Sequence, residues 1–483
     1  MFQQTVCSRG NCGMWAGRAA CCAAIALLFW CRPGLRAQDT NADANAVLPA
    51  LPTAMPLSGL QLRSMSAYAV YYSNGVPVNA GFQSAAANAT ADVGLGGSAV
   101  IAWTKFTDRS SFALTYTPSY TARVRYSSLD AFNNNLALTV SRKLAPRWNL
   151  GFSITGDLSS IDQSLFNATS LGNVTSVPSS FEDLAAGLLA SKFSSNPLLG
   201  SVLNTAPLVE SPVRNLLYGE RMLTTAGRVS LSYSYSPRLS ITFTGGASRA
   251  QHVSDEQPVT AQNNFLVLDS TSGQAGMSIS YSLSPLTQIG GSVTTVRVAS
   301  SIADVDTTTS SVSIGRTVAR RWILMAHGGV GVAKSIRQTT YQFSSTPKPA
   351  VGGSIGFKTF ANTLLASFDR SVSDSYGLGA STSSSAGFSW RWSRPGRSWW
   401  LTSNFGWQRL ETGNSGSAAS FLQNTSGWQV TSGLGRNLNR HLTLLLEYAY
   451  LNYSGGFQKT AYSLSQNAVR VSLAWTPHPD IPR

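Results

Sequence analysis

The side chains best suited to metal binding and proton transfer are four histidines, His252, His327, His441 and His478. They are scattered along the chain, with no spacing typical of a metal site. No hydrolase signature is present, and the glycine-rich stretches 94–97 and 352–353 precede no helical pattern, which excludes a phosphate-binding loop. We therefore expect no catalytic residue, no metal site and no cofactor, and we do not expect an enzyme.

The five cysteines all lie near the amino terminus, at Cys7, Cys12, Cys21, Cys22 and Cys31. They fall in a segment whose apolar run, Ala19–Trp30, is flanked by Arg18 and Arg32 and followed by small residues up to Ala37. This pattern is typical of a secretory signal peptide, so we predict that residues 1–37 are removed, with translation starting at Met1 or Met14. The mature chain then has no cysteine, which excludes thiol catalysis and Cys-ligated metals.

Beyond residue 60 the sequence alternates between apolar and polar residues. In 112–126 the even positions are almost all aromatic or aliphatic, whereas the odd positions carry Ala, Ser, Thr and Arg. The same alternation recurs in 148–154, 229–235, 275–283, 388–392, 442–450 and 469–475. A period of two indicates β-strands, each with one apolar and one polar face.

Short turns separate these stretches in pairs. Eight candidates are Thr107–Arg109, Ala145–Arg147, Ser236–Arg238, Ser284–Leu286, Ala319–Arg321, Phe360–Asn362, Arg394–Arg397 and Asn437–Arg440. The opposite connections, such as 252–271 and 337–348, are longer and polar. Eight turns join sixteen strands, and flanking strands near Met65–Tyr72 and Ala468–Trp475 raise the count to about eighteen. Breaks in the alternation at 287–299 and 362–372 leave sixteen as the alternative.

We predict an all-β fold, a single transmembrane antiparallel up-and-down β-barrel over residues 60–475. A soluble sandwich also alternates, but here the apolar face is rich in Trp and Tyr near strand ends and the polar face carries few charges. No apolar run is long enough for a membrane helix, and only a closed sheet satisfies its backbone in lipid otherwise. Residues 38–59 form a periplasmic linker, too short to be the folded plug of a siderophore receptor.

With its signal peptide, alternating tight turns and long loops, and a terminal strand ending on Trp475, the chain resembles bacterial outer-membrane β-barrels of the porin-like family. The resemblance implies a Gram-negative outer membrane, with its lipid and lipopolysaccharide as surroundings. It also implies that the barrel assembly machinery recognises Trp475. The chain departs from the pattern by continuing after Trp475 into a basic, proline-rich tail, 476–483.

The third external loop, 158–224, has no strand pattern. Within it a short helix is predicted to begin at Ser179 or Ser180 and to end before Pro197. Its apolar stripe includes Phe181, Leu184, Leu188 and Phe193. The segment either packs as an external lid on neighbouring loops or folds into the lumen as a constriction.

Alternation assigns ten charged residues to the lumen. The cations are Arg123, Arg125, Lys143, Arg228, Lys358, Arg391 and Arg470, and the acids are Asp157, Asp369 and Glu447. Seven cations against three acids predict a positive lumen potential. The alternative is that several of them lie at strand ends, near lipid headgroups. The basic residues are dispersed, so we expect no nucleic-acid partner.

Two functions fit this fold. The first is a passive channel for small hydrophilic solutes with a weak anion preference, since eighteen strands leave room for an aqueous lumen. The second is a closed barrel with a structural, adhesive or export-anchoring role carried by its external loops. A barrel enzyme is a weaker third. The sequence leaves the oligomeric state and the solute open.

Overall fold

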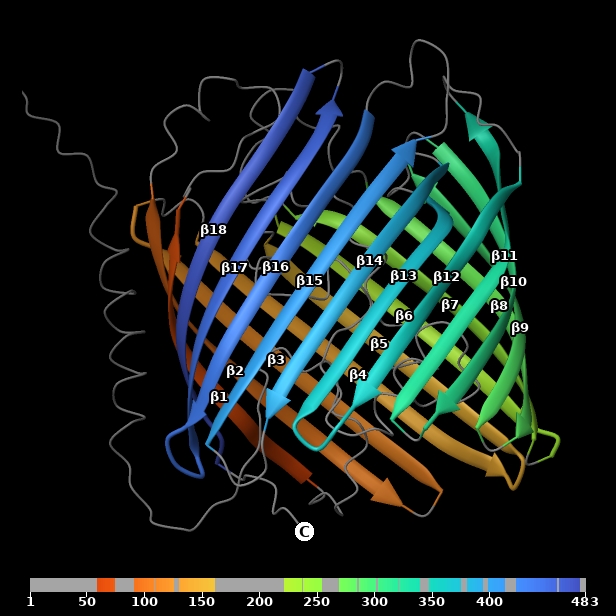
Figure 1. Ribbon diagram of the computed structural model, residues 1–483, viewed down its shortest axis with the longest axis horizontal. Coiled ribbons are helices and arrows are strands. Elements are labelled where there is room, and N and C mark those ends of the chain that lie inside the picture. The colour runs from red at the N-terminus through yellow and green to blue at the C-terminus, as the bar shows by residue number, and fades with distance from the viewer. Residues whose placement is uncertain are drawn as a thin grey trace, which may run out of the picture.

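The computed structural model describes residues 59–73, 91–107, 109–125, 130–160, 221–236, 238–253, 269–284, 286–300, 303–319, 321–338, 347–374, 380–393, 398–412, 423–457 and 460–477. These residues form eighteen strands in one antiparallel sheet (Figure 1). The strands are β1 (Gly59–Tyr72), β2 (Asp92–Thr107), β3 (Ser110–Arg123), β4 (Ala131–Ala145), β5 (Trp148–Ser160), β6 (Arg221–Ser234), β7 (Leu239–Val253), β8 (Ser270–Ser284), β9 (Thr287–Ser300), β10 (Ala303–Val318), β11 (Trp322–Gln338), β12 (Lys348–Lys358), β13 (Asn362–Asp374), β14 (Ala380–Ser393), β15 (Trp399–Thr412), β16 (Gln423–Asn437), β17 (Leu442–Phe457) and β18 (Thr460–Trp475).

The sheet closes on itself through its first and last strands. Each strand pairs with its neighbours in the chain, and β1 pairs with both β2 and β18. The closing ladder joins Met65–Tyr72 to Ala468–Trp475. Closure leaves no free sheet edge, which a hydrocarbon environment requires. The predicted antiparallel barrel of eighteen strands is therefore confirmed.

Each of the eight predicted short turns falls between two strands that pair with each other, and the strand ends on either side lie at the lower end of the barrel in Figure 1. Polar side chains of the turns bind the backbone there. The Ser236 hydroxyl accepts the Leu239 N–H at 3.0 Å, and the Asn439 side-chain oxygen accepts the Leu442 N–H at 2.8 Å. These local bonds explain why Ser and Asn mark the turns in the sequence.

The two segments with irregular alternation are regular strands, β9 and β13. In β9 the adjacent glycines Gly290 and Gly291 supply no side chain to either face, which hides the pattern. In β13 Leu365 is buried at 6% exposure on the face opposite the exposed Phe368. One apolar residue on the polar face is enough to obscure a period of two.

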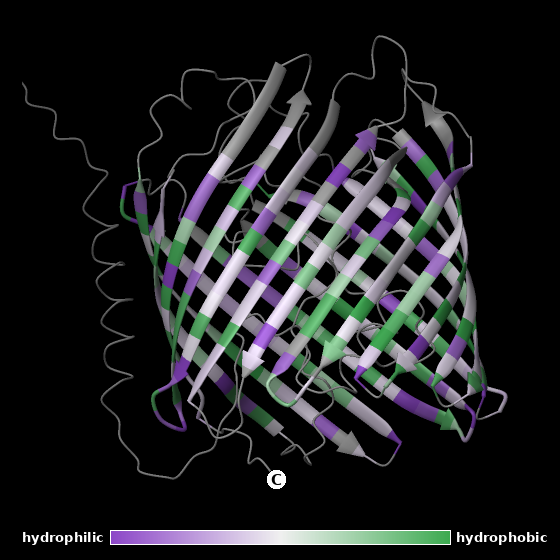
Figure 2. Ribbon diagram, viewed as in Figure 1, coloured by the Kyte–Doolittle hydropathy of each residue, from purple (hydrophilic) through white to green (hydrophobic). Residues whose placement is uncertain are grey.

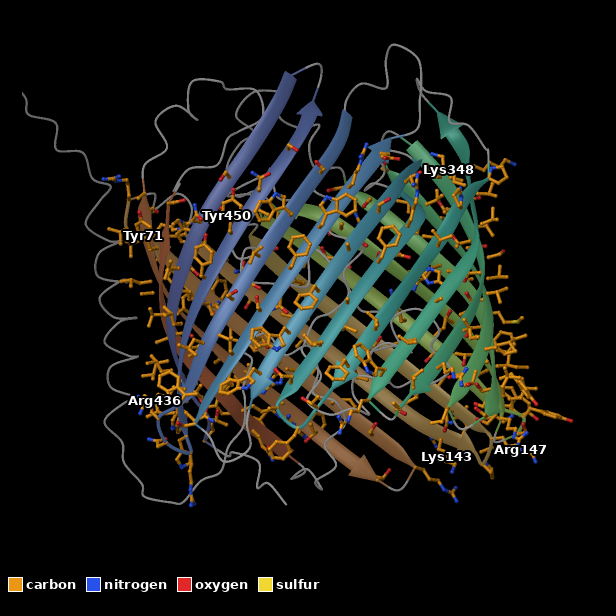
Figure 3. The ribbon with its side chains drawn as sticks, in the orientation of Figure 1. Tyr71, Lys143, Arg147, Lys348, Arg436 and Tyr450 are labelled. Carbon is orange, nitrogen blue, oxygen red and sulfur yellow. The ribbon has the colours of Figure 1, made fainter. Side chains whose placement is uncertain are left out.

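Large apolar side chains cover the outer surface of the barrel. Tyr71, at the outer edge of the barrel in Figure 3, is 48% exposed, and Leu446, Val471 and Val293 are exposed to a similar degree. Hydrophobic and hydrophilic residues alternate along the strands in Figure 2. Burial of such an apolar surface requires lipid around the barrel.

Aromatic pairs lie at two levels of the barrel wall, one close to the tight turns and one about halfway along the strands. Close to the tight turns, the Trp148 and Tyr233 rings lie 4.5 Å apart and the Trp322 and Phe357 rings 4.3 Å apart. Farther from the turns, the Trp428 and Tyr450 rings are 4.7 Å apart. Aromatic girdles at two levels mark the two membrane interfaces of a transmembrane barrel.

Some predicted segments lie outside the described residues: the signal peptide 1–37, nearly all of the linker 38–59 and the tail beyond Pro477. So does the predicted loop helix with Phe181, Leu184, Leu188 and Phe193. The ladder of β5 and β6 reaches Ser160 and Arg221, so both strands extend into the range predicted as loop, 158–224. Among the described residues, no helix has the length and apolarity to span a bilayer.

The outer surface gives a first prediction. Leu446→Lys should destabilise the barrel by about 2–4 kcal/mol, because a cation near the middle of the lipid-facing band is poorly solvated. Unfolding by urea in lipid vesicles measures the change. Leu438→Lys is the matched control: Leu438 is 50% exposed but lies in a tight turn, so its substitution should cost far less. Equal effects at both positions would contradict a lipid-facing band.

Candidate functional site

The inner wall of the barrel is lined mainly by small polar residues. Serine pairs on neighbouring strands hydrogen-bond across it, including Ser66–Ser98 at 2.7 Å, Ser240–Ser280 at 2.8 Å and Ser292–Ser311 at 2.9 Å. Each of these serines alternates with exposed apolar neighbours, such as Leu95, Tyr281 and Val293. Because opposite faces of a strand point to opposite sides of the sheet, the hydroxyls point inward. The wall can therefore solvate polar molecules.

Two arginines and one histidine on this wall each have an acidic partner, and the first is Arg123 at the loop-side end of β3. Its guanidinium lies 3.5 Å from the Asp92 carboxylate, and both side chains are buried. The guanidinium also lies 3.6 Å from the centroid of the Tyr72 ring. The other Asp92 oxygen accepts the backbone N–H groups of Val93 and Arg125 at 2.8 and 3.0 Å. Asp92 thereby joins the start of β2 to the end of β3 and compensates the charge of Arg123.

The second pair lies where the barrel closes. Glu447 of β17 and Arg470 of β18 are directly opposite in the ladder and form an ion pair. The Arg470 guanidinium also lies 5.8 Å from the Tyr68 ring centroid on β1. The contacts of Arg470 therefore span three strands across the seam between the first and last strands.

The third pair spans a whole strand. His327 of β11 and Asp369 of β13 are both opposite Gly352 of the intervening strand β12. The His327 Nε2 and Asp369 Oδ1 atoms are 3.2 Å apart. A Cβ atom at Gly352 would lie 2.4 Å from His327 Cε1 and 2.9 Å from Asp369 Oδ1, so only glycine leaves room for this contact.

Arg228 differs from these residues. On the inner face of β6 it lies opposite Ser153 of β5 and Gly246 of β7, and Gln274 of β8 follows in the same row. A Cβ atom at Gly246 would meet Arg228 Cγ at 3.0 Å and Gln274 Nε2 at 3.1 Å, so the two side chains converge above the glycine. No carboxylate in the described part of the chain pairs with Arg228.

The remaining predicted lumen residues lie at different heights. Asp157 accepts a hydrogen bond from Asn135 Nδ2 at 3.4 Å on the β4–β5 wall. Arg125 is exposed just beyond β3, and Lys143 lies at the tight-turn end, where Figure 3 labels it. Arg391, also near the tight turns, lies 6.0 Å from the ring of Trp400.

The structure says less about the roles of two further predicted residues, Lys358 and Trp475. The backbone of Lys358 ends β12 beside a tight turn, and its side chain lies outside the described residues. Trp475 ends β18, opposite Leu442 and Met65, with 37% exposure on the outer surface.

Several wall residues were not predicted from the sequence, namely Asp92, Tyr72, Gln274 and Trp400. Asp92 could have been found, because it alternates with the exposed Val93 and Leu95 at the start of β2. Trp400 lies on Gly435, whose Cβ position is 2.0 Å from the indole ring, and that contact depends on the register of β15 and β16. Within the described residues, no group of three or more His, Cys, Asp or Glu could hold a metal ion.

No family model and no curated protein matches the sequence. Several solved structures are similar to this chain at low identity. Pseudomonas aeruginosa OccK2 (OpdF) is 10% identical, with a TM-score of 0.41 over 86% of this chain and 98% of that one. P. aeruginosa OpdK is 11% identical, with a TM-score of 0.40 over 86% and 98%. The siderophore receptor PirA from Acinetobacter baumannii is 7% identical, with a TM-score of 0.40 over 86% and 81%.

These similarities concern the fold alone. The closed eighteen-stranded barrel itself, with its apolar outer surface, aromatic girdles and tight turns at one end, has the architecture of outer-membrane porin-like β-barrels.

The His327–Asp369 contact gives a second prediction. Gly352→Ala should destabilise the barrel by about 1–3 kcal/mol, because the new methyl group overlaps the pair. Gly328→Ala is the control: nothing lies within 4 Å of its Cβ position, and alanine favours the folded chain there. Urea unfolding in vesicles compares them, and equal stability of the two variants would contradict the packing described.

Proposed function

We propose that the protein is an outer-membrane channel through which small hydrophilic solutes diffuse. The observation that carries the proposal is the closed barrel of eighteen strands with a hydroxyl-lined inner wall. Barrels of eight strands are filled by their own side chains, whereas barrels of sixteen to eighteen strands leave an aqueous lumen. Serine and threonine hydroxyls can replace part of the hydration of a passing solute without binding it tightly.

The charges of the inner wall support only a weak anion preference. Asp92 and Glu447 compensate Arg123 and Arg470, so these cations contribute little to the potential in the lumen. The positive charge of Arg228 is not compensated, because no described acid faces it. We therefore assign to Arg228, with Gln274 beside it, the main attraction for anions. The other cations predicted in the lumen contribute to the field of one mouth or the other.

One observation favours the second candidate function, a closed barrel. Val70, Tyr72, Ala449, Leu451 and Ala468 lie on the inner wall of β1, β17 and β18, and each is at most 5% exposed. Water does not reach this part of the wall. If the occlusion extends across the lumen, the protein acts through its external surface, as an anchor or adhesin.

Conductance separates these functions and gives a third prediction. Refolded protein lacking residues 1–37 should give steady single-channel currents in a planar bilayer, with a reversal potential biased to chloride in a salt gradient. Arg228→Gln should move that reversal potential toward zero, because it removes the uncompensated charge. If the correctly folded protein gives no conductance in the bilayer, the result contradicts the channel function and favours the closed barrel.

The control for selectivity is Arg436→Gln. Arg436 lies at the tight-turn end, where Figure 3 labels it, with its guanidinium 4.8 Å from the ring of the outward-facing Trp399. Its loss should leave the reversal potential unchanged. If Arg228→Gln and Arg436→Gln shift the reversal potential equally, the selectivity is not set at Arg228.

A further inference from the structure

The ladder between β12 and β13 stops short of the loop-side end of the barrel. These strands pair from the tight turn up to Val351–Arg370. Beyond that level β12 continues to Lys348 beside β11, and Ser371–Asp374 of β13 continues beside β14. In the described ladders these two neighbouring strands are therefore not paired with each other at their loop-side ends.

Two prolines explain where this ladder stops. At the tight turn the Thr359 N–H donates to the Asn362 carbonyl at 2.8 Å, and hydrogen-bonded pairs recur at every second residue of an antiparallel ladder. Odd-numbered residues of β12 therefore direct their backbone groups toward β13. Pro347 and Pro349 belong to this series and have no N–H to donate. Between them Lys348 is on the inner face, and proline combined with an inward-pointing charge is a common protection of a sheet edge.

The end of the β13–β14 hairpin lies inside the wall, against β10 and β11. Val372 shares the outer face of β13 with Phe368, which is 44% exposed, yet Val372 is buried with Val305 of β10 and Ala333 of β11. Val305 and Ala333 are on the inner faces of their strands. A Cβ atom at Gly331, also on the inner face of β11, would lie 3.1 Å from Val372 Cβ. An outer face can contact an inner face in this way only if the hairpin end passes inside the wall.

Strand β14 shows the same arrangement. Thr382, directly opposite Val372, is 3% exposed and Ser384 is 8% exposed, whereas Phe388 on the same outer face is 42% exposed. The Lys348 Nζ group donates to Thr382 Oγ1 at 3.1 Å. Because Lys348 is on the inner face of β12, this bond also places the end of β14 inside the wall. The outer face of β14 therefore meets protein here instead of lipid, which suits its small hydroxyl residues.

The wall is thus two layers thick on this side of the loop-side mouth. We call the inner layer, Ser371–Asp374 with Ala380–Ser383, the inner tip. Stacked sheets lie at most about 10 Å apart when small residues such as Gly331 are at the contact, so the inner tip takes that much width from the lumen. Its lumen-directed face carries Ser371 directly opposite Ser383.

We propose that the inner tip is a constriction that limits the size of the solutes passing the loop-side mouth. The inference rests on the proposed channel function and assigns its size limit to one hairpin. The prolines of β12 keep β13 from continuing the wall, and the contacts of Val372 and Thr382 hold the inner tip in place.

A disulfide tests the position of the inner tip without relying on conduction. The chain from residue 38 onward has no cysteine, and a disulfide joins Cβ atoms about 3.5–4.5 Å apart. Gly331→Cys/Val372→Cys should therefore cross-link on mild oxidation of the folded barrel, seen as a change in gel mobility that a reductant reverses. Gly331→Cys/Phe368→Cys is the matched control and should stay reduced, because Phe368 is on the same face but faces lipid. No cross-link in the first pair, or equal cross-linking in both, would overturn the proposal.

Shortening the hairpin tests the constriction itself. Arg370 and Ser384 are directly opposite, so an Asn-Gly turn can join them in place of residues 371–383. In a planar bilayer the shortened barrel should conduct about 1.5-fold more than the wild type, because its mouth is wider. It should also admit larger sugars in liposome-swelling assays.

The matched control shortens the β17–β18 hairpin, whose strands stay paired up to Phe457–Thr460. An Asn-Gly turn between Tyr453 and Leu464, which are directly opposite, removes a similar length of chain from the wall itself. Conductance and the size of the admitted sugars should then stay at the wild-type values. Equal conductance of the two shortened barrels would contradict the constriction.

A modified cysteine keeps the constriction testable if the shortened barrel does not fold. Ser371→Cys, reacted with a bulky charged thiol reagent, should lower the conductance about twofold, because the reagent adds volume at the mouth. Ser248→Cys on the inner face of β7 is its control and should lose much less. If the unmodified barrel carries no current, the proposed channel fails and the constriction with it. If it conducts and neither the shortening nor the modification alters the current, the constriction alone fails.

Discussion

The structure depends on one constraint: a backbone N–H or C=O group in hydrocarbon must have a hydrogen-bond partner within the protein. The β1–β18 ladder meets this constraint by closing the sheet. Once the sheet is closed, a period of two in the sequence becomes a division between lipid and lumen, because successive side chains must point to opposite sides of the wall. The apolar outer band, the polar inner wall and the aromatic girdles are all consequences of that closure. Because the tight turns join the strands at one end of the barrel, the longer connections, which permit more variation in sequence, join them at the other end.

Charge on the inner wall is mostly compensated by neighbours on the wall itself. Pairing across adjacent or next-nearest strands holds Arg123, His327 and Arg470 against the sheet, which limits their reach into the lumen and ties the strands together at the same time. An uncompensated cation on such a wall stands out, and Arg228 is one in the described part of the chain. On this wall local charge balance, and not the number of basic residues, distinguishes a structural contact from a candidate binding site.

The barrel can be predicted from the sequence because the signals that mark its strands and turns are local. Alternation over a few residues defines a face, and a Ser, Pro or Asn defines a turn, so the strand number follows from counting. Contacts that depend on register are not local. The partner of Arg123 is Asp92, thirty-one positions earlier, and the register of β2 on β3 brings them together. The contact of Val372 with Val305 and Ala333 is even harder to predict from the sequence, since alternation gives the face of Val372 but not the part of the sheet that covers it. Leu365 is a different case: this buried apolar residue on the polar face of β13 obscures the alternation of a strand that is regular in the structure.

Neighbouring residues on one strand face lipid and water alternately, and the function proposed for the barrel depends on this. All five cysteines lie between positions 7 and 31, so the chain from residue 38 onward is cysteine-free and suits single-cysteine labelling. The most direct measurement compares Ser292→Cys, on the inner wall of β9, with Val293→Cys beside it on the outer surface, using a small charged thiol reagent on protein in lipid vesicles. We expect rapid modification at 292 and protection at 293. Modification at 293, or protection at both positions, would contradict a water-filled barrel surrounded by lipid.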